Sequence, residues 1–139
     1  MTHSPADTLR AAALRLRALA EEATPGPWRQ HDTHLDLGGH TATVFSGTGN
    51  DTSLRAWLPT MSHEPWDDRR NVWADASYIA AMHPGVGTAL ADWLDSAASL
   101  VTGYPDLGAD HDRGACDDFA CDLVGHALAV ARAILGVHQ

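Results

Sequence analysis

The chain of 139 residues contains no lysine, and its nine basic residues are all arginine. The chain has eighteen acidic residues, and its formal net charge is therefore −9. Proteins that bind duplex nucleic acid neutralise its phosphates with clustered Lys and Arg. The charge balance therefore argues against direct binding of duplex nucleic acid.

Long apolar runs are also missing, so the sequence predicts no membrane-spanning segment. The first residues, MTHSPADTLRAAALRLRALAEEA, lack the charged-then-apolar order of a signal peptide, and we expect a cytoplasmic protein. Hydrophobic residues make up 45% of the chain, which argues against disorder. Length and composition together predict a single domain over residues 1–139.

Cysteine is scarce, with only Cys116 and Cys121. If both lie on one helix, the five-residue step separates them by roughly 7.5 Å along the axis and turns them to different sides. That geometry does not suit a disulfide, and we expect buried thiols in a reducing compartment. The same spacing argues against a zinc site formed with His111 and His126, because structural zinc ligands come in closely spaced pairs.

Catalytic motifs are absent as well. The chain has neither the Gly-x-Ser-x-Gly of a nucleophile elbow nor a phosphate-binding loop ending in Lys. We therefore expect no self-contained active site. His83, which precedes Pro84, is expected to cap the end of a helix, and Asp122 is expected to pair with His126 one helical turn later.

Helical periodicity and Pro/Gly punctuation predict the order of elements. Ser4-Pro5 begins a helix that ends before Thr24-Pro25, and Asp67 or Asp68 caps a second helix that stops at Pro84. Two further helices follow, the last over about residues 116–135. Apolar alternation on either side of Gly38-Gly39 predicts two or three antiparallel strands from Trp28 to about Ser46. The pattern from Gly47 to Glu64 leaves two alternatives, a loop throughout or a loop with a short strand at Leu54 to Leu58.

This order predicts an α+β fold with an N-terminal helix, a small antiparallel sheet and three packed helices. We expect a core to which all four helices contribute. The last helix is apolar on two sides and is expected to be central. The large side chains expected to be buried are Trp73, Ile79, Leu90, Trp93, Phe119, Leu123, Leu128 and Val130.

Three short patterns carry a resemblance. They are Ala23-Thr24-Pro25-Gly26-Pro27-Trp28, the segment from Asn71 to Pro84 with its Ala-Ser-Tyr-Ile-Ala-Ala centre, and the closing stretch from Ala127 to Gly136. In these the chain resembles small hypothetical proteins of actinobacteria and of phages or prophages, with "ATPGPW" and "NAxFIAAA" elements. The resemblance implies a bacterial or phage accessory protein and assigns no catalytic residues.

The most site-like cluster lies around the predicted hairpin and comprises His31, Asp32, His34, Asp36 and His40. Imidazole and carboxylate are good ligands for zinc and iron. On a strand His34 and Asp36 would share a face, and His40 could approach them across the turn. His31, His34, Asp36 and His40 are the ligand set of a candidate zinc or other divalent metal site. The alternative is a solvated hairpin face with no cofactor.

A second candidate is an acidic surface near the C-terminal third of the chain. Eight Asp residues from Asp92 to Asp122 are opposed there only by Arg113. The residues expected to contact a protein partner are Asp106, Asp110, Asp112, Asp117 and Asp118. Such a run is usually a solvated face, and the alternative is a docking surface that steers the approach of a basic protein. The sequence thus favours a small non-enzymatic binding module, with a metal-binding protein or metal-dependent hydrolase as the alternative.

Overall fold

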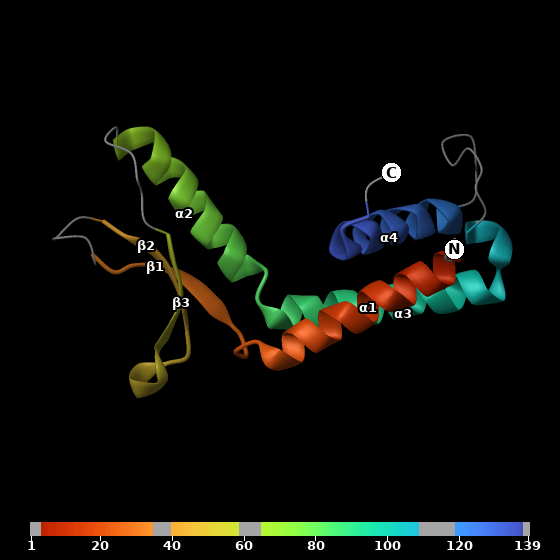
Figure 1. Ribbon diagram of the computed structural model, residues 1–139, viewed down its shortest axis with the longest axis horizontal. Helices are drawn as coiled ribbons and strands as arrows, with labels where there is room; N and C mark the ends of the chain where they lie inside the picture. The colour runs from red at the N-terminus through yellow and green to blue at the C-terminus, as the bar shows by residue number, and fades with distance from the viewer. Residues whose placement is uncertain (1–3, 35–39, 59–64, 109–118, 138–139) are drawn as a thin grey trace. The chain divides into compact units, whose positions relative to one another are not determined.

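The computed structural model describes residues 4–34, 40–58, 65–108 and 119–137 (Figure 1). An N-terminal helix precedes a three-stranded antiparallel sheet, and three further α-helices follow within the described residues. The α+β prediction is confirmed. The chain divides into two compact units, one formed by residues 1–22 with 87–139 and the other by residues 23–86.

Helix α1 (Pro5–Glu22) opens the first unit as its sequence predicts. The Oγ atom of Ser4 accepts a hydrogen bond of 3.1 Å from the backbone N–H of Asp7, which caps the helix. Leu9, Ala12 and Ala13 are buried and Leu16 packs against the same core, but Leu19 is 56% exposed. The apolar contact of α1 therefore does not extend to Leu19.

The core of this unit packs α1 against α3 (Pro84–Gly103) and α4 (Phe119–Leu135), with Leu107 of the short 3₁₀ helix η2 (Pro105–Gly108) at its end. Small residues dominate it, which lets the helix backbones approach closely. The buried residues of α3 and α4 are Ala91, Leu94, Ala97, Ala98, Val101, Cys121, Val124, Ala127, Leu128 and Ala131.

Part of the predicted core is wrong. Trp93 is 39% exposed, Leu123 45% and Phe119 77%. On α4 the face with Val124 and Leu128 is buried against the other helices, and the face with Phe119 and Leu123 is not. Both faces are apolar in sequence, so periodicity could not choose between them.

Arg17 on α1 forms ion pairs with two acids of α3. Its guanidinium donates to Asp95 at 2.5 Å and to Asp92 at 2.8 Å. These hydrogen bonds, first that of Asp92 and then that of Asp95, raise the pKa of Arg17. Arg113 is the only basic residue within the acidic run, but Arg17, from a distant part of the chain, pairs with two of its members.

The second unit is built on a sheet of strand order β1-β2-β3, with β1 (Trp28–Asp32), β2 (Ala42–Ser46) and β3 (Ser53–Leu58). Both pairings are antiparallel, and the register of β2 with β3 shifts at Val44/Phe45, which leaves Arg55 as an extra residue. Residues opposite each other share a face, so Trp28, Val44 and Ala56 lie on one side.

Helix α2 (Pro65–Ala81) packs on this side of the sheet. Ala76 and Ala80 form a core with Ala42 and Val44, and the partly buried side chains around it include Trp28, Trp73 and Ile79. The expectation of one core shared by four helices is wrong, since α2 contributes to the sheet cluster and α1, α3 and α4 to the other. The helix begins at Pro65, so Asp67 and Asp68 lie within it instead of capping it.

His83 caps the helix that follows it, not the one that precedes it. Its Nδ1 accepts a hydrogen bond of 3.1 Å from the backbone N–H of Gly85, in the first turn of α3. The first helical position is Pro84, which suits a helix start. The ring also lies close to Gly26, where an added Cβ would come within 2.4 Å of Nδ1. Glycine at position 26 thus makes room for the cap.

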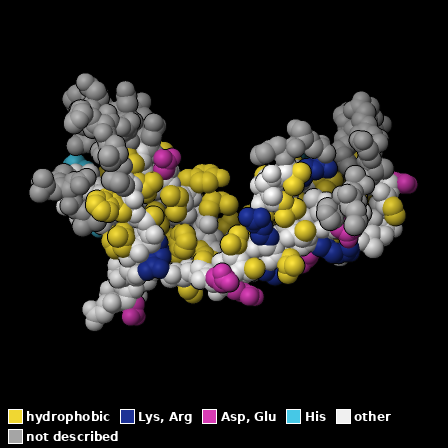
Figure 2. Space-filling model, in the orientation of Figure 1, with side chains coloured by type: hydrophobic (Ala, Val, Ile, Leu, Met, Phe, Trp, Pro, Cys, Tyr) yellow, Lys and Arg dark blue, Asp and Glu magenta, His cyan; other side chains and the backbone are white. Residues whose placement is uncertain are grey.

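No helix among the described ranges has the length and hydropathy needed to cross a membrane. Hydrophobic side chains nonetheless reach the surface of each unit, among charged ones (Figure 2). They include Leu14 at 71% exposed in the first unit and Trp57 at 49% in the second.

Candidate functional site

The candidate site forms where β1 ends. The Oδ1 atom of Asp32 accepts two backbone hydrogen bonds, from His34 N–H at 3.3 Å and from Thr41 N–H at 2.9 Å. The first of these is an Asx-type turn, in which an Asp side chain binds the backbone two residues on. His34 adopts a left-handed backbone with φ of 53°, so the chain leaves the strand direction here.

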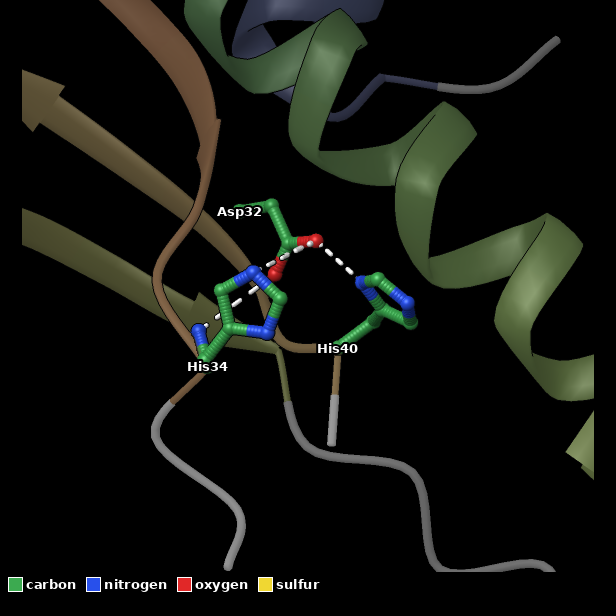
Figure 3. A group of neighbouring side chains, drawn as sticks. All are labelled: Asp32, His34 and His40. Atoms are coloured by element: carbon green, nitrogen blue, oxygen red, sulfur yellow. Dashed lines mark hydrogen bonds and ion pairs between the residues drawn. The ribbon is translucent and has the colours of Figure 1, made fainter. Parts of the chain in front are cut away.

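These two backbone bonds leave the other carboxylate oxygen of Asp32 to face a pair of imidazoles (Figure 3). His40 Nδ1 lies 2.5 Å from Asp32 Oδ2, and His34 Nε2 lies 3.5 Å from the same oxygen. The two rings are tilted with their centroids 4.9 Å apart. One carboxylate oxygen and two imidazole nitrogens therefore converge, all within 4.8 Å of one another.

The environment of Asp32 keeps its carboxylate ionised. Partial burial raises the pKa of this group, but the hydrogen bond from His40, the backbone N–H groups of Thr41 and His34 and the charge of His34 together lower it to about 2. A carboxylate that accepts several hydrogen bonds is favoured in its charged form. Asp32 is thus an ionised carboxylate held by hydrogen bonds at the end of β1.

This depressed pKa predicts a pH dependence for the metal-free protein. Because the pKa falls from 3.8 to about 2 on folding, the ionised carboxylate stabilises the fold above about pH 4, and this contribution is lost as pH falls to 2. We expect wild type to have a higher urea midpoint than Asp32→Asn at pH 5 in EDTA. The difference should shrink as pH falls from about 4 to 2, because the protonated carboxyl resembles the amide. A pH-independent difference would contradict this origin.

The structure gathers only part of the predicted ligand set. His34 and His40 take part, and Asp36 lies outside the described residues. His31 does not join them, since its ring packs edge-on against Phe45 with centroids 5.7 Å apart. The predicted strand through His34 is wrong because β1 ends at Asp32.

Asp32 belongs to the sequence cluster but not to the predicted ligand set, although the structure places it at the centre of the group. The sequence feature that could have identified Asp32 as a member of the group is the segment Asp32-Thr33-His34, which precedes Gly38-Gly39. An Asp at a strand end commonly accepts a hydrogen bond from the backbone two residues later, which fixes its side chain.

A metal ion of the zinc class fits this group. Zinc lies about 2.0–2.2 Å from imidazole nitrogen and carboxylate oxygen, so neighbouring ligand atoms stand roughly 3 to 3.5 Å apart. The distance of 3.5 Å between His34 Nε2 and Asp32 Oδ2 already has this value. The distance of 2.5 Å between His40 Nδ1 and Asp32 Oδ2 would have to increase by less than about 1 Å, which a rotation of the exposed His40 side chain can provide. Two imidazoles and one carboxylate leave coordination positions open for water or another ligand.

A pocket of about 440 Å³ adjoins the cluster. Its lining residues are Arg29, His31, Asp32, Thr33, His34, Phe45 and Thr52. Arg29 and Phe45 lie opposite each other on the sheet face that α2 does not cover. The volume falls in the range of small-molecule sites.

Of the five Asp residues expected to contact a protein partner, only Asp106 lies within the described residues. Asp106 is exposed on η2, and Asp110, Asp112, Asp117 and Asp118 lie outside the described residues. The predicted pair on α4 is confirmed, with His126 Nε2 at 3.6 Å from Asp122 Oδ2 and both side chains exposed.

Comparison of the chain with known protein families, with curated proteins and with solved structures gave no match.

Proposed function

We propose that the protein binds a divalent transition metal ion, with zinc the expected ion, through Asp32, His34 and His40. The observation that supports this best is the convergence of three ligand atoms of the right chemistry within 4.8 Å. The backbone holds Asp32 by two hydrogen bonds independent of the imidazoles, so the carboxylate is oriented before any metal arrives. Preorganised ligands lose less entropy on binding.

The proposed site is of the type that keeps a coordination position open, unlike structural zinc sites, in which four protein ligands surround the metal. His34 and His40 are 53% and 61% exposed, and three protein ligands do not complete a tetrahedral shell. A site of this kind keeps a coordination position for an exchangeable ligand. The proposal therefore takes up the metal-binding alternative, because three ligand atoms converge at this position.

The test is zinc titration of protein purified without a His tag and stripped with EDTA. We expect one equivalent of zinc per chain. Changing Asp32→Asn, or His34→Ala together with His40→Ala, should weaken binding by more than the roughly 10- to 100-fold that loss of an outer-shell partner costs. Protons compete for the imidazole nitrogens, so the affinity should fall as pH is lowered.

The matched control is His126→Ala. His126 is also an exposed histidine beside a carboxylate, but it forms a pair with Asp122 and not a group of three. This variant should retain full zinc binding. Absence of bound zinc in wild type, or equal loss in the His126 variant, would refute the proposed site.

A further inference from the structure

The turn between α2 and α3 contains an imidazole whose hydrogen bond depends on its protonation state. His83 is partly buried, and its Nδ1 accepts the hydrogen bond of 3.1 Å from the backbone N–H of Gly85. A ring nitrogen of histidine accepts only while it carries no proton, so the proton of the neutral ring is on Nε2 in this arrangement. The cap of α3 therefore requires the neutral ring and one of its two tautomers.

His83 binds the first two N–H groups of α3. Pro84, the first residue of the helix, has no N–H group to offer. The next N–H group, that of Gly85, donates to the imidazole, and that of Val86 donates to the carbonyl oxygen of His83 at 2.9 Å. Loss of the ring as an acceptor therefore leaves the N–H of Gly85 without its partner at the start of the helix.

Backbone encloses the edge of the ring that makes this bond. An added Cβ would come within 2.4 Å of Nδ1 at Gly26 and within 2.8 Å of Cε1 at Gly85, so both residues lie directly against the imidazole. A proton on Nδ1 would point toward the N–H of Gly85, and two donors would then face each other. The ring would have to turn away from the helix.

The charges around His83 do not favour its protonated form. Residues 23–28 and 76–91, which include the contacts of the ring, contain no Asp, Glu, Lys or Arg, and Tyr78 is their only other titratable group. Within the described residues, the histidines that form ion pairs are His34, His40 and His126. The N-terminus of a helix carries a partial positive charge, which repels a cation placed there.

From this geometry we propose that His83 is a pH-sensitive cap, which holds the first turn of α3 while the ring is neutral and releases it when the ring is protonated. Histidine changes its charge between about pH 5 and pH 8, so the device would act near physiological pH. The chain enters the second unit after residue 22 and leaves it after residue 86. Gly26 and His83 lie near these two ends, and release of the cap loosens both. The proposal does not depend on a bound metal.

The experiment compares wild type with His83→Asn in EDTA by urea unfolding, followed by tryptophan fluorescence. Asn is a favoured capping residue whose oxygen accepts a hydrogen bond and does not titrate, so this variant should fold. The folding equilibrium constant of wild type, divided by that of the variant, should fall at least about 5-fold from about pH 7.5 to about pH 5. His83→Ala has no acceptor, and should be less stable than wild type only at the higher pH.

Nitrogen chemical shifts of protein labelled with nitrogen-15 at histidine report the tautomer directly. We expect His83 to carry its proton on Nε2 at about pH 7.5. His126→Asn is the matched control, because His126 lies 3.6 Å from the carboxylate of Asp122 and gains an ion pair when protonated. Its ratio should not fall with pH. A ratio for His83→Asn that is independent of pH, or a proton on Nδ1 of neutral His83, would overturn the proposal.

Discussion

Replacing Leu128 with Ala is expected to lower the free energy of unfolding by about 2–4 kcal/mol. Leu128 is 2% exposed in the three-helix core, where it packs with residues of α1 and α3. Truncation removes buried methyl groups and leaves a cavity among small neighbours that have little freedom to fill it. The measurement is the urea midpoint followed by far-ultraviolet circular dichroism.

Leu123→Ala is the matched control on the same helix. Leu123 is 45% exposed, so the same change should cost less than about 1 kcal/mol. Equal losses for the two variants would mean that both faces of α4 are buried in solution, for example against a partner or a second copy of the chain.

Replacing Gly47 with Ala is expected to destabilise the sheet unit by about 2–5 kcal/mol. Gly47 has φ of +80°, and an added Cβ would lie 2.2 Å from the carbonyl oxygen of Asp51. The backbone conformation is unfavourable for Ala, and the clash is with backbone that a rotamer change cannot relieve. Four of the five Trp residues fall within residues 23–86, so tryptophan fluorescence during urea unfolding reports on this unit.

Gly49→Ala isolates the clash. Gly49 also has positive φ, at +56°, but nothing lies within 4 Å of the position that an added Cβ would take. This variant should lose about 1 kcal/mol, the cost of the backbone conformation alone. Similar losses at the two positions would show that the contact with Asp51 is absent.

Several hypotheses from the sequence stay predictions. The acidic surface at Asp106, Asp110, Asp112, Asp117 and Asp118 rests on composition, and so does the cytoplasmic location. The resemblance to actinobacterial and phage accessory proteins rests on three short patterns. Retention of the same partners from a lysate by wild type and by a variant with the five Asp changed to Asn would exclude the acidic surface.

Local features of the chain determined the secondary structure. Ser4-Pro5 begins α1, Pro84 separates α2 from α3, and the alternation of Ala42 and Val44 predicts β2. These signals act between neighbours in sequence, through capping, fixed φ values and side-chain period. The same local patterns identified His34 and His40 as candidate ligands, since residue type alone determines what a side chain can coordinate.

The faces of the helices were decided only by the tertiary structure. On α4 two apolar stripes satisfy the same periodicity, and the stripe with Val124 and Leu128 is buried because the small residues of α1 and α3 accommodate it. The ion pairs of Arg17 join residues 75 and 78 positions apart, a separation that no local pattern encodes.

The composition of the candidate site was likewise decided in three dimensions. Extending β1 through His34 would have placed His31, His34 and Asp36 by strand alternation, whereas the chain turns at Asp32. Hydrogen bonds from the N–H groups of His34 and Thr41 hold that carboxylate between two imidazoles. His31 instead packs on Phe45, across the sheet. The residue types came from the sequence, but their convergence depended on a turn whose hydrogen bonds close between residues eight and nine positions apart.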